Sequence, residues 1–209
     1  MIIRPRLKAK TAGLTAVVAT VVAPTAVSAH MMFNSDEFYG GAAHPWINLE
    51  SSLLLITACL WLVQWNRLGD PRPLIAFSTA LISGTAVGAL LHLPLPPPVL
   101  GYSLVMLAGL LVAGKLKIRR NASVSIVFVL CFYAGMTAGA DAAVDVKSPL
   151  LFLSGVSIGA VLVPLIIAGM LVDRKSSLVI VGIRIVGSWV AAIGLMLLAF
   201  SLRKTLHGG

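Results

Sequence analysis

The chain reads His44-Pro45-Trp46-Ile47-Asn48-Leu49-Glu50-Ser51 and then continues directly into the apolar segment 52–65. This apolar segment has the composition of a membrane helix, and the polar stretch before it forms the mouth of that helix. A carboxylate at such a position costs free energy unless it has a partner, a wet cavity or a functional role. Glu50 is therefore the first candidate functional residue.

The composition is that of a polytopic membrane protein. Of the 209 residues, 58% are hydrophobic and only 11% are charged, and the mean hydropathy is +0.98, which is far above that of soluble domains. The basic residues fall in short clusters between apolar segments, which is typical of membrane loops and not of a nucleic-acid-binding face. Cys59 and Cys131 both lie inside apolar segments, so we interpret them as small hydrophobic residues without a disulfide or zinc.

Residues 1–29 have the order of a secretory signal peptide. Four basic residues (Arg4, Arg6, Lys8 and Lys10) precede the weakly apolar run 12–23, and Val27 and Ala29 occupy the two positions that a signal peptidase recognises. Cleavage after Ala29 would leave His30 as the N-terminus. The competing interpretation is an uncleaved signal anchor, which would give seven spans and a cytoplasmic N-terminus.

Residues 30–46 are predicted to form an exposed, non-cytoplasmic arm, because they show no clean period and contain a glycine pair at 40–41. A free terminal amine and the imidazole of His30 can together chelate Cu(II) or Ni(II), with Met31 and Met32 as soft neighbouring ligands. An unstructured terminus that happens to begin with His is the alternative.

Six segments are long enough to span a bilayer, which predicts an all-α transmembrane domain over residues 47–202 and a short tail over 203–209. Eighteen or more helical residues cover the ~30 Å hydrocarbon core at about 1.5 Å per residue. The segments are 47–65, 73–93, 99–116, 122–140, 150–172 and 178–202. Small residues recur four apart inside them (Gly84 and Gly88, Gly109 and Ala113, Gly135 and Gly139, Gly155 and Gly159), which predicts close helix packing.

The loop charges predict the orientation. The first span is followed by Arg67 and Arg72, the third by the four basic residues in 115–120, and the fifth by Arg174 and Lys175. The other two loops contain only Lys147. Basic residues in short loops stay in the cytoplasm. Both the mature N-terminus and the C-terminus are therefore expected on the non-cytoplasmic side.

This orientation places Glu50, His92 and Asp141 toward the outer face, with His44 just before them, and predicts an outward-facing polar vestibule. The simpler interpretation is that His44 is an interfacial residue beside Trp46, and that His92 is satisfied at a helix end. Arg184 lies about two turns inside the sixth span. It either extends its guanidinium to lipid phosphates or pairs with Asp173. No catalytic motif is present, so an enzyme is not expected.

The segment pattern resembles the HupE/UreJ family of membrane proteins. The resemblance rests on a signal followed by His30, on His-Pro-x-x-x-Leu-acid before the first of six spans, on Pro-Leu-Pro at 94–96 and on Gly-Ile-Arg at 182–184. It implies a bacterial inner-membrane protein of the nickel or cobalt permease type, associated with hydrogenase and urease gene clusters. The metal ion would be cargo, and no resident cofactor is expected.

Two family motifs are degenerate here. The first, His, five residues, Asp, His, reads His44, five residues, Glu50, Ser51; the second, which has two His, holds Ala134 and Ala138 at those positions and ends in Asp141. The remaining candidate ligands are His44, Glu50, Asp141 and Met136, together with His30 of the arm. Metal handling or import is the first hypothesis, and a non-transporting accessory or scaffold subunit with a partner in the membrane is the second. A proton-coupled carrier working through Glu50 is a weaker third.

Overall fold

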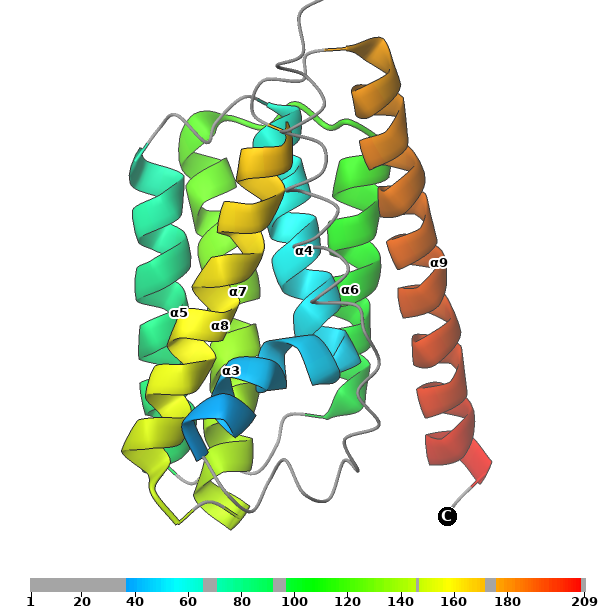
Figure 1. The fold of residues 1–209 in the computed structure, drawn as a ribbon. Helices are drawn as coiled ribbons and strands as arrows, with labels where there is room; N and C mark the ends of the chain where they lie inside the picture. The colour runs from blue at the N-terminus through cyan, green and yellow to red at the C-terminus, as the bar shows by residue number, and fades with distance from the viewer. Residues whose placement is uncertain (1–36, 66–70, 92–96, 146, 172–175, 208–209) are drawn as a thin grey trace, which may run out of the picture. The chain divides into compact units, whose positions relative to one another are not determined.

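The computed structural model describes residues 37–65, 71–91, 97–145, 147–171 and 176–207, all within the unit Asp36–Gly209. The regular structure of these residues is helical throughout, which confirms the all-α class (Figure 1). The helices are α3 (Glu37–Ile47), α4 (Leu49–Gln64), α5 (Pro71–Leu91), α6 (Pro98–Ala113), α7 (Arg120–Asp145), α8 (Pro149–Leu171) and α9 (Ser177–His207).

Helices α4 to α9 each coincide with one of the six apolar segments. Three of them begin at a proline, namely Pro71, Pro98 and Pro149. Proline suits the first helical position, because its ring sets a helical φ and its missing N–H would have no partner there. The helix starts are therefore encoded locally, while their lengths follow the apolar runs.

The span count is three or four by length and composition in the described residues. Arg72–Leu91, Arg120–Asp141 and Ser177–Lys204 are long and apolar enough, and α3 with α4 forms a fourth candidate if the bent pair is one broken span. Helix α6 has 16 residues, which rise about 24 Å and fall short of the ~30 Å core of a bilayer. The six-span count stays a prediction.

Helix α4 is the central element of the bundle. It packs against α6, α7, α8 and α9 as well as against α3. Most of its side chains are buried, and Leu54, Leu55 and Leu62 are among the largest fully buried side chains described. The N-terminal turn of α4, which carries Glu50, is therefore held by neighbours on several sides.

Glycines join the other helices in close pairs. In the α5 and α7 pair, Gly84 and Gly88 lie against the backbone of α7, and Gly135 and Gly139 lie against the backbone of α5. In the α6 and α9 pair, the backbone at Gly109 meets that at Gly187 and Ala191. Such small residues let helix backbones approach closely in membranes. The predicted packing role of the glycine spacing is confirmed.

Helix α3 is the main departure from the sequence-based expectation of an exposed arm over 30–46. Residues Glu37–Ile47 form a helix in which Gly40, Gly41 and Pro45 are buried. Gly155 and Gly159 of α8 pack directly on its backbone. Two glycines disfavour an isolated helix, so tertiary packing and not local propensity holds α3. The expected signal peptide 1–29, and with it His30, lies outside the described residues.

The helices alternate in direction, so that α4, α6 and α8 end where α5, α7 and α9 begin (Figure 1). This end, uppermost in the view, carries the basic residues between α6 and α7, whereas α3 lies at the opposite end. The structure thus separates the basic end of the bundle from the end that holds His44 and Glu50.

Candidate functional site

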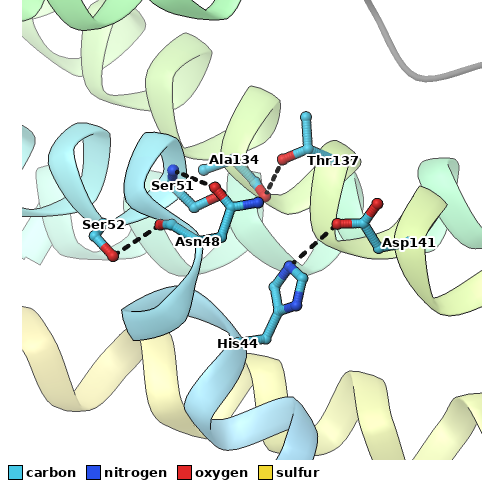
Figure 2. A network of polar contacts seen from close by, with 7 residues as sticks. All are labelled: His44, Asn48, Ser51, Ser52, Ala134, Thr137 and Asp141. Carbon is cyan, nitrogen blue, oxygen red and sulfur yellow. Dashed lines mark hydrogen bonds and ion pairs between the residues drawn. The ribbon is translucent and has the colours of Figure 1, made fainter. Parts of the chain in front are cut away.

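A sharp bend between α3 and α4 builds the site. The two helices meet at 70°. Asn48 caps α4 by accepting a hydrogen bond from the Ser51 backbone N–H at 3.2 Å, and the Ser52 hydroxyl lies 2.8 Å from the Asn48 carbonyl oxygen (Figure 2). The Pro45 carbonyl is a second acceptor within reach of the same hydroxyl. A side-chain cap of this kind satisfies an otherwise unpaired N–H at a helix start. The bend is therefore well anchored.

His44 lies in the last turn of α3 and points toward α7 across this bend. Its Nε2 is 3.5 Å from Oδ2 of Asp141 (Figure 2). The side chains are 15% and 35% exposed, so the pair is half-buried and still reachable. The ring of Phe152 on α8 contacts the imidazole edge-on, with 5.5 Å between ring centroids. Three helices thus fix the imidazole, and a neutral ring has a nitrogen lone pair available for a cation.

Glu50 occupies the first turn of α4 and faces α6 and α7. Its carboxyl group lies against Gly101 of α6 and interacts with the hydroxyl of Tyr133, which is placed to donate a hydrogen bond to it. Its Oε1 is buried without a hydrogen-bond partner among the described residues. The carboxyl groups of Glu50 and Asp141 are also close enough to interact electrostatically. A buried carboxylate oxygen with no donor is a polar group that a cation can satisfy.

The donors in this region are one imidazole and two carboxylates. Imidazole suits first-row transition metals, and carboxylate oxygens add harder, anionic ligands. Within the described ranges, however, no group of three or more His, Cys, Asp or Glu is arranged to hold a metal ion. His44 and Asp141 form a close pair with Glu50 beside it. Their roles as metal ligands stay predictions.

The comparisons with known proteins identify the family. A family model described as HupE / UreJ protein matches residues 17–197. The chain belongs to the HupE/UreJ family. It is therefore a membrane protein of the nickel and cobalt accessory or permease type, from a family of transporters and accessory proteins and not of enzymes. No curated protein and no solved structure matches this chain.

The positions at which this HupE/UreJ chain departs from the His motifs are packed into the bundle. Ser51, Ala134 and Ala138 are 3%, 2% and 2% exposed. The Ser51 hydroxyl has no hydrogen-bond partner among the described residues. These positions therefore border the site without supplying an imidazole to it.

Of the remaining predicted residues of this HupE/UreJ protein, the structure describes Met136 and Arg184. The backbone of Met136 packs on Gly84 and Gly88 of α5, and its partly buried side chain packs against the apolar core. The Nε of Arg184 donates a hydrogen bond to the carbonyl of Ala113 at 2.9 Å, so this side chain ties α9 to the end of α6. His30, His92 and Asp173 lie outside the described residues.

Two residues that contact the Glu50 carboxyl group were not among the site residues predicted from the sequence of this HupE/UreJ chain. Tyr133 and Gly101 both touch the Glu50 carboxyl, yet a tyrosine and a glycine inside apolar segments are unremarkable by composition. The spacing of Tyr133, Thr137 and Asp141 is the signal in the sequence that could have identified Tyr133 as part of the site. Residues four apart share one face of a helix, so a polar stripe runs along α7 toward Asp141.

Proposed function

We propose that this HupE/UreJ protein handles or imports a divalent transition-metal ion of the nickel or cobalt type, and that His44, Glu50 and Asp141 line its entrance. The observation that carries the proposal is the 3.5 Å approach of His44 Nε2 to Asp141 Oδ2, beside the unpartnered Oε1 of Glu50. Three helices converge to bring these groups together. Ionisable groups at membrane depth mark ion pathways more often than structural contacts.

The chemistry of the donors supports a site that holds its ion briefly. Two carboxylates offset the charge of a divalent cation, and the imidazole supplies the borderline nitrogen ligand that nickel and cobalt accept. A site that offers few protein ligands leaves coordination positions for water, which favours release. In the proposal, His30 with its free amine captures the ion first, and the sulfur of Met136 serves as a later contact.

The proposed location is the bacterial inner membrane, with both mature termini on the non-cytoplasmic side. The distribution of charge supports it. Lys115, Lys117 and Arg119 follow α6 at the end of the bundle opposite α3, and basic residues in short loops remain cytoplasmic. The entrance at His44 would then face outward, as uptake requires.

The second candidate function is a non-transporting accessory or scaffold subunit with a protein partner in the membrane. One observation favours it. Ser51, Ala134 and Ala138 are buried where the family motif carries imidazoles, so the fold is kept while donors are lost. A chain that has kept only its packing would retain the glycine contacts between α5 and α7, as this one does.

Metal uptake into proteoliposomes, together with equilibrium dialysis using nickel and cobalt, separates the two functions. If the protein handles or imports metal, His44→Ala, Glu50→Gln and Asp141→Asn should each lower both metal uptake and metal binding. Glu37→Gln is the matched control, because it neutralises a carboxylate in the first turn of α3, seven residues before His44. If the wild type binds no metal above background and copurifies with a stoichiometric membrane partner, the accessory function replaces transport.

A further inference from the structure

An apolar groove runs between α6 and α7 on the outside of the bundle. Its volume is about 280 Å³, and it is lined by Leu104, Leu107, Ala108 and Leu111 of α6 and by Ser125, Ile126, Val129 and Leu130 of α7. Ala108 and Leu130 are buried and form its floor, whereas Leu107 and Val129 are half exposed and form its walls. If α6 and α7 cross the membrane as the sequence predicts, the groove faces the bilayer interior, where its occupant would be a hydrocarbon chain.

A basic depression adjoins this groove along α7. Arg119, Arg120, Asn121 and Ala122 line it. Ala122 is three residues before Ser125, and residues three apart are neighbours on one helix face. Lys117 is also exposed in the connection from α6 to α7. One end of the apolar groove therefore opens at a cluster of cations and an amide side chain.

We propose that this basic depression and the apolar groove together bind one anionic phospholipid. The phosphate lies among Lys117, Arg119 and Asn121, and one acyl chain lies along the groove between α6 and α7. The charge is complementary, because basic pockets at the end of membrane helices select anionic head groups. Arginine adds hydrogen bonds from a planar guanidinium to phosphate oxygens. The site is separate from the His44 region and does not depend on metal transport.

The dimensions fit one leaflet. From Leu104 to Leu111 the helix rises about 10 Å, and from Ala122 to Leu130 about 12 Å. A hydrocarbon core of ~30 Å gives each leaflet roughly 15 Å. The groove thus accepts most of one acyl chain while the head group stays at the basic end.

Native mass spectrometry of the purified full chain tests the site. The protein is titrated with phosphatidylglycerol and with phosphatidylcholine of identical acyl chains, and retention of each lipid is measured. Each basic residue near a head group contributes roughly fivefold in preference for an anionic lipid. The wild type should retain phosphatidylglycerol over phosphatidylcholine, and Lys117→Gln with Arg119→Gln should lower that preference by roughly 25-fold, the product of two fivefold contributions. Lys147→Gln with Lys204→Gln is the control that removes two exposed charges elsewhere, and it should keep the preference.

The proposed binding of an acyl chain is tested by a substitution that fills the apolar groove. Ser125→Trp should lower retention of both lipids with an unchanged melting temperature, whereas Ser154→Trp, at another exposed helix serine, should not. Equal retention of the two lipids by the wild type, equal loss in both double variants, or unchanged retention in Ser125→Trp overturns the proposal. A photoreactive residue at position 107 that cross-links to residues 1–29 or to a second copy, and not to phospholipid, also overturns it.

Discussion

Gly101 of α6 lies so close to the carboxyl group of Glu50 that a Cβ atom at position 101 would overlap Oε1. The hydroxyl of Tyr133 borders the same space. The absence of a side chain at position 101 therefore decides where the Glu50 carboxylate lies. Because the obstructing atoms belong to the ends of side chains and not to backbone, a methyl group there would displace Glu50 without unfolding the helices.

Gly101→Ala should lower nickel and cobalt binding nearly as much as Glu50→Gln does, while its melting temperature stays close to that of the wild type. The control is Gly182→Ala, since a Cβ at position 182 meets nothing within 4 Å. Equilibrium dialysis and thermal unfolding in detergent give the two readouts. Wild-type metal binding in Gly101→Ala would show that the position of Glu50 does not matter for the ion.

The space around each glycine predicts opposite effects on stability when Gly139 of α7 and Gly182 of α9 are each replaced by alanine. Gly139→Ala places a methyl group on the backbone carbonyl of Thr85, so the helices must separate. Overpacking of this kind costs about 1 to 3 kcal/mol. Gly182→Ala has free space in α9 and should stabilise the protein by roughly 0.5 to 1 kcal/mol, because alanine loses less backbone entropy than glycine. Thermal unfolding measures both, and a drop of equal size at the two positions would contradict the packing argument.

The sequence predicts the helical bundle well because each apolar segment is long and uniform. Helix α3 was not predicted, because its glycines at 40 and 41 and its internal Pro45 weaken any local helix signal. Its structure comes from Gly155 and Gly159 of α8, which lie more than a hundred residues away in the chain. Packing between distant segments is not visible in a local pattern.

In the candidate site, too, the sequence predicts the general position of the residues but not the contacts between them. His44, Glu50 and Asp141 could be assigned to one end of the bundle, since each lies at a helix end whose direction follows from the loop charges. The contact of His44 with Asp141 depends on the 70° bend at Asn48, and that of Glu50 with Tyr133 depends on the packing of α4 against α7. Nothing in the apolar pattern indicates that bend, because Asn48 is read as an ordinary polar residue before a span.

Arg184 links α9 to the end of α6, and its removal should loosen that contact. Its Nε donates to the carbonyl of Ala113, one of the last carbonyls of α6 and therefore without a helical N–H partner. Arg184→Gln should lower the free energy of unfolding by about 0.5 to 1.5 kcal/mol, the usual net value of one hydrogen bond. A double-mutant cycle with Asp173→Asn tests the proposed ion pair. Coupling near zero would leave the Ala113 carbonyl as the partner that matters, and substantial coupling would establish the pair with Asp173.

Single cysteines at positions 117, 147 and 204 decide between six spans and four. If all of α4 to α9 cross the membrane, position 117 lies inside and positions 147 and 204 lie outside. If α6 and α8 do not cross, α7 runs in the opposite sense, so position 117 lies outside and position 147 inside, while position 204 remains outside. We expect a membrane-impermeant thiol reagent to label 147 and 204 in intact cells and 117 only after permeabilisation. Cys59 and Cys131 are buried and should give little background. Label at 117 in intact cells would favour the four-span count. It would also contradict the alternating helix directions of the structure, in which α6 ends and α7 begins at the end where α5 begins (Figure 1).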